Sequence, residues 1–364
     1  MLKRLYVHNY KCLVNFEINF DQDISLFLGA NGSGKSTVFE VLAKLRRVIV
    51  DEEKLANIFD FEDTPRWVTP DPIEKSKVRF ELDLEIKGVL YKYLLVIEFV
   101  NRTKELSIEE ESFGFDDELF ILSKNGKTTL VAKNNEELPF DNSRSCMRFF
   151  QYKSFINALN TFFIVRIKPY EMTSTINKAD SKIRTDFSNF AEWFAHLNEN
   201  NRRDVSIFED EMRDILPGFD YFKIEQAGQA KVLQVEFENK SNKKDIITYY
   251  FNELSEGQKV LISLYALIYC APEYSLICID EPENFLALPE IQPWLNVLRE
   301  RCKRRFLQAL IISHHPSLIN FLAPDSGYWF SRQENHTTFE KITEQEEDGL
   351  SLAQLIEMGW IYGD

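Results

Sequence analysis

The stretch Gly29-Ala30-Asn31-Gly32-Ser33-Gly34-Lys35-Ser36-Thr37 predicts the fold of this chain. It follows the apolar run 24–28, which is typical of a buried strand, and it precedes 38–45, where apolar residues recur at helical spacing. A G-x-x-x-x-G-K-S loop between a strand and a helix is the context of a phosphate-binding loop. The stretch therefore predicts an α/β fold of the P-loop NTPase type.

The residue types of this loop suit a nucleoside triphosphate. Gly29, Gly32 and Gly34 allow the backbone to curl so that successive N–H groups point at a phosphate chain. The helix start adds unpaired N–H groups and the positive end of its dipole. We expect Lys35 to reach the β- and γ-phosphates of ATP and the Ser36 hydroxyl to ligate Mg²⁺. The other predicted nucleotide contacts of the loop are Asn31, Ser33 and Thr37. The alternative is a glycine-rich turn with a chance lysine, which leaves the flanking strand and helix patterns unexplained.

Charge and composition narrow the class of protein. The 364 residues carry a formal net charge of −15, which disfavours non-specific nucleic-acid binding by the whole molecule but leaves a local basic groove open. Five scattered cysteines predict buried free thiols in a reducing compartment. No signal peptide is recognised, and no apolar run reaches the roughly 20 residues that span a bilayer. We expect a cytoplasmic protein without a membrane partner.

Hydrophobic periodicity outlines the remaining elements. The predicted strands are 3–7, 15–20, 77–84, 89–98, 118–122, 128–132, 162–167, 220–225, 231–237, 245–251, 275–280 and 308–313. The predicted helices are 185–197, 206–215 with Asp204 as its cap, 256–269, 289–304, 316–322 and 351–358. The region 51–76 is expected to be an irregular loop, and 135–160 has no assignable pattern. Alternation of helix and strand after residue 255 predicts βα units and a parallel sheet.

A second carboxylate-bearing motif ends the apolar run 275–280. Asp280 and Glu281 follow it directly, as expected of the other half of a P-loop NTPase site. Asp280 would hold the Mg²⁺ shell, and Glu281 would accept a proton from the attacking water. The alternative is an ordinary turn carboxylate.

The motif Leu254-Ser255-Glu256-Gly257-Gln258 stands 25 residues before Asp280, at the predicted start of a helix. It resembles the signature motif of ABC-type ATPases. The resemblance implies that Ser255, Gly257 and Gln258 of one subunit close over the γ-phosphate bound by another, so that ATP joins a homodimer with composite sites. A structural reading, a capping box between Ser255 and Gln258, is compatible with that role.

Two further motifs fit the same class. His314 ends the apolar run 308–313 and matches the histidine that senses the γ-phosphate in ABC-type heads. Asn9-Tyr10-Lys11-Cys12 resembles an element of RecF- and SMC-type ATPases, in which a basic residue lies beside the nucleotide. Lys11 is therefore a candidate phosphate contact, with a surface lysine as the alternative.

The order of these motifs along the chain is similar to that in the OLD/AbiEii-like AAA ATPases of bacteria. The resemblance covers 1–45 and roughly 200–325. It implies a head domain of ABC/SMC type, with a mixed sheet, an antiparallel β-rich lobe and an inserted helical subdomain. Where that family continues D-E-P-E-N-x-L-H-P, this chain has Phe285-Leu286-Ala287-Leu288-Pro289 after Asn284. The region 326–364 is too short for a Toprim nuclease. Gln151 is the candidate for a Q-loop glutamine.

The motifs divide the chain into five segments. These are the first part of the head (1–50), a β-rich lobe with an insertion (51–160), a helical and strand subdomain (161–252), the second part of the head (253–325), and terminal strands with a short helix (326–364).

The functional hypothesis is an ATPase that dimerises on ATP and regulates a separate effector, such as a nuclease or toxin, in anti-phage defence or a toxin–antitoxin system. The alternative is a RecF/SMC-like repair or recombination ATPase that binds DNA directly. A transporter subunit is disfavoured by the 220 residues between Lys35 and Ser255, and a nuclease lacks a motif. The basic cluster Arg299, Arg301, Lys303, Arg304 and Arg305 fits the end of a helix, with nucleic-acid contact as its alternative.

Overall fold

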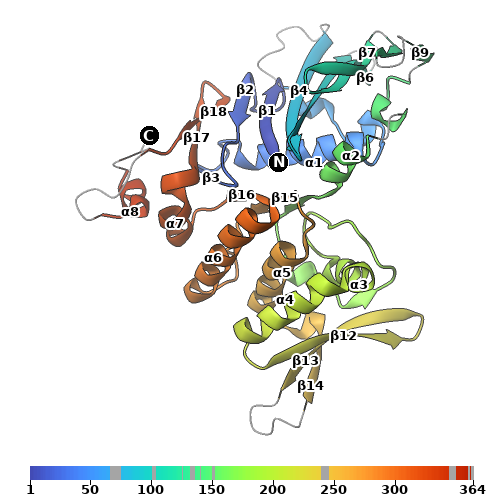
Figure 1. Ribbon diagram of the computed structural model, residues 1–364. Helices are drawn as coiled ribbons and strands as arrows, with labels where there is room; N and C mark the ends of the chain where they lie inside the picture. The colour runs from blue at the N-terminus through green and yellow to red at the C-terminus, as the bar shows by residue number, and fades with distance from the viewer. Residues whose placement is uncertain are drawn as a thin grey trace. The chain divides into compact units, whose positions relative to one another are not determined.

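Antiparallel strands form the largest sheet of the computed structural model (Figure 1). The structure describes residues 1–65, 75–100, 104–124, 126–131, 136–139, 141–149, 152–238, 246–343, 350–359 and 361. The chain divides into two compact units, and each is described by itself. The first contains Met1–Phe162, Tyr274–Leu276 and Asp325–Glu344, and the second contains Phe163–Glu273, Ile277–Pro324 and Gln345–Asp364.

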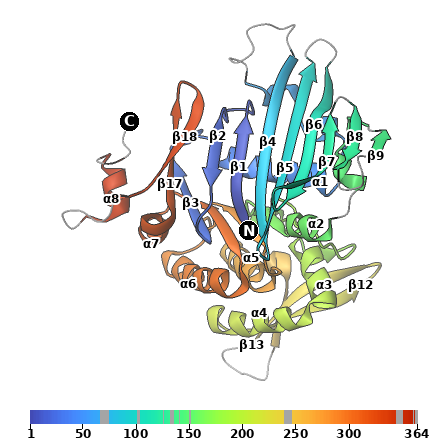
Figure 2. The same cartoon turned by 45° about the horizontal axis from the view of Figure 1, so that its top comes forward.

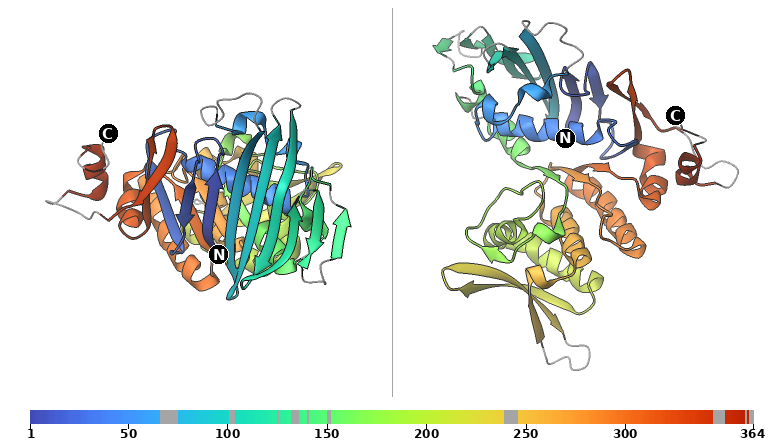
Figure 3. Two further views of the ribbon diagram at one scale, coloured as in Figure 1. Left: turned by 90° about the horizontal axis from the view of Figure 1, so that it is seen from above. Right: turned by 180° about the vertical axis from the view of Figure 1, so that it is seen from behind.

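The antiparallel sheet belongs to the first unit, and α1 (Lys35–Ile49) lies across one of its faces (Figures 2 and 3). Its eight strands are, in spatial order, β2 (Phe16–Asn19), β1 (Leu2–His8), β4 (Lys75–Ile86), β5 (Val89–Val100), β6 (Glu105–Phe115), β7 (Glu118–Lys124), β8 (Lys127–Leu130) and β9 (Glu136–Pro139). Lys87 and Gly88, with φ of 52° and 83°, form the turn between β4 and β5. Positive φ at both turn residues suits the right-handed twist of a hairpin.

A smaller set of strands in this unit carries the phosphate loop. β3 (Ile24–Gly29) is fully buried and pairs in parallel with β17 (Gly327–Gln333), which pairs antiparallel with β18 (His336–Lys341). Phe27 packs on Phe330, with ring centroids 4.7 Å apart. The strand, loop and helix order predicted around Gly29 is therefore confirmed. The short helix α2 (Lys153–Asn160) lies in the region that had no sequence assignment.

The second unit contains the signature motif. Three of its strands are neighbours in the order β10 (Phe162–Val165), β15 (Leu276–Asp280) and β16 (Gln308–Ile312). A four-stranded sheet has the order β11 (Thr175–Ile176), β13 (Ala230–Glu238) and β12 (Phe219–Ala227), with β14 (Ile246–Tyr250) also paired to β13. Its helices are α3 (Phe190–Asn200), α4 (Arg202–Ile215), α5 (Glu256–Cys270), α6 (Leu288–Arg305), α7 (Pro316–Ser326) and α8 (Leu352–Glu357). Helix α5 is buried from Lys259 to Cys270, as expected of a helix that is apolar all round.

Two sequence expectations in this unit are corrected. The helix expected from residue 185 begins at Phe190, because Asn189 bonds the backbone of Arg184 and Lys182 and so holds the preceding residues in turns. Asp204 is not the cap of α4, whose N-cap position is Asn201. The Asp204 carboxylate instead accepts hydrogen bonds from Asn201 Nδ2 at 2.8 Å and from Arg305 at 3.1 Å.

Most of the other predicted elements are confirmed, and all five cysteines are buried free thiols. Strands β6, β9 and β11 had not been predicted, and β17 and β18 had been expected only as terminal strands without bounds. Strand β6 contains four glutamates, a composition that does not suggest a strand. No helix among the described residues is long and apolar enough to span a membrane.

Candidate nucleotide site

The loop after β3 has a backbone that only glycine tolerates at two positions. Gly29 has φ of 126°, and a Cβ there would lie 2.0 Å from the carbonyl oxygen of Phe330. Gly34 has φ of 104°, and its Cβ would lie 2.3 Å from Thr337 Oγ1. Gly32 also has positive φ, at 80°. The loop is therefore packed against β17 and β18 on one side, and its curl needs the glycines.

Lys35 is enclosed by this loop and is only 6% exposed. Its ammonium donates hydrogen bonds to the carbonyl oxygens of Gly29 at 2.6 Å and Ala30 at 2.9 Å. Ser33 Oγ lies 3.4 Å from the same nitrogen. The positive charge thus sits inside the curl of the loop, where the phosphates of a nucleotide would be placed. Asn31, Gly32 and Ser36 are exposed, so they are open to a ligand.

Thr337 of β18 supports the loop from outside. Its hydroxyl donates to the carbonyl oxygen of Ser33 at 2.8 Å, and Ser33 is 2% exposed. Its backbone N–H donates to the carbonyl oxygen of Cys12 at 2.9 Å. Sequence reasoning missed this residue, because more than 300 positions separate it from the loop and no local pattern marks it.

Lys11 lies near the loop, in a network of charges around the start of α1. Its ammonium contacts Glu40 Oε1 at 2.6 Å and Asp63 Oδ1 at 3.6 Å, and Lys44 pairs with Asp63 at 2.6 Å. Burial opposes the charge of Lys11, but the hydrogen bonds and negative charges of Glu40 and Asp63 together outweigh burial and raise the pKa of Lys11. Glu40, Lys44 and Asp63 had not been singled out from the sequence.

A cavity of about 930 Å³ opens beside this network. Its lining includes Thr37, Cys12 and Lys11, so it reaches the first turn of α1 from the side. The charged side chains of its lining are three cations and three carboxylates: Lys11, Lys104, Arg332, Asp60, Glu62 and Asp63. The cavity therefore presents both signs of charge beside the loop.

In the second unit, Ser255 is the exposed N-cap of α5. Its Oγ accepts from the Gln258 N–H at 3.3 Å, and Gln258 Oε1 accepts from the Ser255 N–H at 3.0 Å. This is the expected capping box. Gly257 is close to the loop after β15, because a Cβ on it would lie 2.9 Å from the carbonyl oxygen of Phe285.

Asp280 is the half-buried last residue of β15, and Glu281 follows it with φ of 56°. The Glu281 carboxylate accepts hydrogen bonds from Arg166 at 2.8 Å and from Asn284 at 3.0 Å. Its backbone N–H donates to the carbonyl oxygen of Ile312, the last residue of β16. This hydrogen bond therefore links the loop that carries Glu281 to the end of the strand that precedes His314.

Glu283 makes a second link between these loops. Its Oε1 accepts from Ser313 Oγ at 2.6 Å and from the backbone N–H of His314 at 3.3 Å. The Ser313 hydroxyl in turn accepts from the His315 N–H at 3.0 Å. The His314 side chain is exposed, while its backbone is held by Glu283.

The remaining predicted residues have other surroundings. The candidate metal ligands Ser36 and Asp280 belong to different units, and no cluster of three or more His, Cys, Asp or Glu among the described residues would hold a metal. Gln151 lies outside the described residues. In the basic cluster, Arg301 stacks on Tyr269, Arg299 on Phe321, and Arg305 pairs with Asp204. These contacts give three of the five cations a role in packing.

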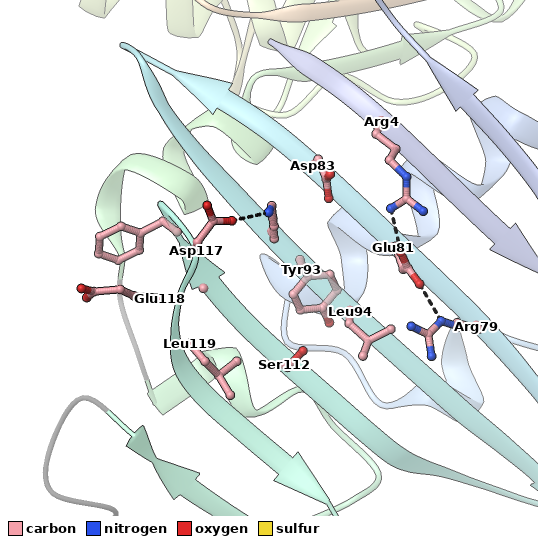
Figure 4. A pocket seen from close by; sticks show the side chains of 13 residues that line it. Arg4, Arg79, Glu81, Asp83, Tyr93, Leu94, Ser112, Asp117, Glu118 and Leu119 are labelled. Atoms are coloured by element: carbon pink, nitrogen blue, oxygen red, sulfur yellow. Dashed lines mark hydrogen bonds and ion pairs between the residues drawn. The ribbon is translucent and has the colours of Figure 1, made fainter.

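A separate cavity of about 460 Å³ lies on the antiparallel sheet (Figure 4). Its cations are matched by carboxylates: Arg4 and Arg79 both contact Glu81 at 2.6 Å, and Lys92 contacts Asp117 at 2.7 Å. Burial raises the pKa of Asp83 in the same cavity. Because these charges neutralise one another, we assign this cavity no part in nucleotide binding.

Residues 24–320 match the protein family described as "AAA domain, putative AbiEii toxin, Type IV TA system". The chain belongs to this family. It is an ATPase of the ABC/SMC type, as its motifs had predicted, and such ATPases use a nucleotide.

Known proteins and structures resemble parts or all of the chain. It is 31% identical over 94 residues to the DNA double-strand break repair Rad50 ATPase of Methanocaldococcus jannaschii. These 94 residues are 26% of this chain and 8% of that protein. The chain thus matches less than a tenth of that relative. A structure of the SmcHead bound to the C-winged helix domain of ScpA has a TM-score of 0.55 at 13% identity, covering 94% of this chain and 98% of that one. The SMC head domain from Thermotoga maritima has a TM-score of 0.49 at 16% identity, covering 94% and 99%. The first of these two structures shows that the fold is that of an SMC head.

Proposed function

We propose that this ATPase forms a homodimer when ATP is bound and regulates a separate effector in bacterial anti-phage defence or a toxin–antitoxin system. The observation that carries the nucleotide part is the loop from Gly29 to Lys35, with its enclosed ammonium and glycine-only backbone. The description of the family, which names a type IV toxin–antitoxin system, supports the biological part. The effector would be a nuclease or a toxin.

The phosphate loop would bind the triphosphate of ATP. The backbone N–H groups of Gly29, Asn31, Gly32, Ser33 and Gly34 would surround the phosphates, and Lys35 would exchange its carbonyl partners for the β- and γ-phosphates. Thr37 and Lys11, which line the adjoining cavity, would contact the rest of the nucleotide.

Four residues would act at the γ-phosphate. Ser36 and Asp280 would hold Mg²⁺, which neutralises charge on the phosphates when bound. Glu281 would accept a proton from the attacking water, and His314 would donate a hydrogen bond to the γ-phosphate.

The second copy would complete the site. Ser255 lies at an exposed helix start, and Gly257 and Gln258 are partly exposed beside it. A helix N-terminus attracts anions through its dipole, so this surface suits a γ-phosphate held by another subunit. The dimer would then form on ATP binding and dissociate after hydrolysis.

The experiment compares the wild type with Glu281→Gln in ATPase assays and in mass measurements by light scattering. We expect the rate to fall on the order of 10²–10³-fold, as when one well-placed catalytic group is lost. ATP with Mg²⁺ should double the mass of the variant. A variant that hydrolyses ATP as fast as the wild type would disprove the role of Glu281.

The second candidate function is DNA repair or recombination by direct DNA binding. It is favoured by the 94-residue similarity to the Rad50 ATPase. Strong binding to duplex DNA, with an affinity that falls steeply with salt, would support it. Weak DNA binding, together with co-purification of a nuclease or toxin from the native host, would support the effector model.

A further inference from the structure

The carboxylate of Glu281 is held on one side only. Arg166 Nη2 and Asn284 Nδ2 both donate to Oε2, at 2.8 and 3.0 Å. Within the described part of the chain, Oε1 accepts no hydrogen bond, and the side chain is 28% exposed. One oxygen is therefore fixed and the other is open to water.

The backbone around this carboxylate is also fixed. Glu281 has φ of 56°, a left-handed conformation that a residue with a side chain adopts at a cost. Its N–H is held by Ile312 at 2.8 Å. Residues in such conformations concentrate at functional sites, where the surrounding structure maintains them.

Arg166 reaches Glu281 from a neighbouring strand. It directly follows β10, which is next to β15 in the sheet, and its own N–H donates to the carbonyl oxygen of Thr185 at 2.7 Å. Its side chain is 58% exposed, so solvent screens the ion pair and the pair contributes little to stability. Stability alone is therefore a poor reason for this contact.

We propose that Arg166 is a positioning residue that orients Glu281 so that Oε1 accepts the proton of the attacking water. The inference rests on the proposed role of Glu281 as the base. A base must lie within hydrogen-bond reach of the proton it removes, and a shift of about 1 Å can cost on the order of 100-fold in rate. With Oε2 held by Arg166, the carboxylate cannot rotate away from that geometry.

The opposing interpretation is that the contact is inhibitory, a latch: Arg166 would keep the Glu281 carboxylate away from the attacking water until a nucleotide or a partner released it. The two interpretations predict opposite changes in rate. Loss of a positioning arginine lowers kcat, whereas loss of a latch raises it.

The test measures kcat and KM for ATP in full-length Arg166→Ala and Arg166→Lys. We expect kcat to fall about 10- to 100-fold in Arg166→Ala with KM unchanged, because Arg166 acts on the base and not on ATP binding. Arg166→Lys should recover part of the rate, and guanidinium ion added to Arg166→Ala should recover part as well. Arg184→Ala is the matched control, since Arg184 is 62% exposed and pairs with Glu192 at 3.7 Å.

A double variant separates this inference from the proposed function. If Arg166 acts through Glu281, Arg166→Ala combined with Glu281→Gln is no slower than Glu281→Gln alone. Unchanged or increased kcat in Arg166→Ala, a change confined to KM, or additive losses in the double variant would overturn the inference. Wild-type activity in Glu281→Gln would instead disprove the proposed role of Glu281 as the base.

Discussion

Helices α1 and α5 both begin at a motif that binds phosphate in ATPases of this type, yet their first turns are built differently. The N-cap of α1 is Gly34, which has no side chain to bond the helix N–H groups. The N-cap of α5 is Ser255, whose hydroxyl bonds the Gln258 N–H, and Gln258 bonds back. The first turn of α1 therefore has no side-chain cap, whereas the first turn of α5 is capped by its own side chains.

The difference suggests that the two helix starts have different roles in binding ATP. The loop at α1 encloses a buried lysine and is supported by Thr337, so contacts within the protein hold its shape. The start of α5 is exposed and capped, so it is stable without a ligand. In the proposed dimer the first would bind ATP, and the second would add to a site already occupied.

Two buried lysines give the largest predicted contrast. Lys35→Ala should abolish detectable ATP binding and lower hydrolysis by on the order of 10³-fold, because it removes the cation inside the loop. Lys259, 6% exposed in α5, donates to the carbonyl oxygen of Pro169 at 3.4 Å, and burial lowers its pKa. Lys259→Ala should therefore keep ATP binding. Titration with a fluorescent ATP analogue measures both.

If Lys35→Ala and Lys259→Ala lost ATP binding equally, the proposal that ATP binds at the start of α1 and not at the start of α5 would be contradicted. Circular dichroism of both variants checks that each is folded.

Two glycines test the same contrast at the backbone. Alanine at Gly34 would combine a φ of 104° with a Cβ 2.3 Å from Thr337 Oγ1. Such strain costs about 1–3 kcal/mol, so we expect ATP affinity to fall roughly 10- to 100-fold in Gly34→Ala. Gly257→Ala should leave ATP affinity unchanged and should weaken only the ATP-dependent dimer. Calorimetric titration of ATP into each variant measures the affinities, and an unchanged affinity in Gly34→Ala would contradict the account of the loop.

The cap of α5 gives the smallest predicted effect. Ser255→Ala removes the acceptor of the Gln258 N–H, and losing such a cap costs about 1 kcal/mol. Urea unfolding should show this loss as a lower midpoint with an unchanged slope. Ser255→Asp, which can still cap the helix, is the control and should retain the midpoint. No loss in Ser255→Ala would mean that the capping box does not stabilise α5.

Local sequence patterns were sufficient for β3, α1, α5 and β15, because each combines hydrophobic periodicity with a motif at its end. They failed where a charged residue is buried: Glu111 of β6 is fully buried and accepts hydrogen bonds from Tyr93 OH and from the Cys146 N–H, both at 2.7 Å. Burial raises the pKa of Glu111, as expected of a carboxyl removed from water.

In the candidate site, the residues of contiguous motifs could be predicted from the sequence, but the long-range contacts that support them could not. Lys35, Ser255 and Glu281 lie in contiguous motifs, whereas the contact of Arg166 with Glu281 spans 115 positions and that of Thr337 with Ser33 spans 304. Nothing near Arg166 or Thr337 in the sequence marks their partners. Such contacts depend on tertiary folding and were found only in the structure.

The central claim is that the ATP bound by one copy is completed by Ser255 of another, and mixing two inactive variants tests it directly. Lys35→Ala cannot bind ATP, and Ser255→Arg blocks the exposed start of α5. Each alone should be inactive. In an equal mixture, half of the two-fold dimers contain both variants and have one intact composite site, so about a quarter of the wild-type ATPase rate should return. A mixture as inactive as its components would contradict the account.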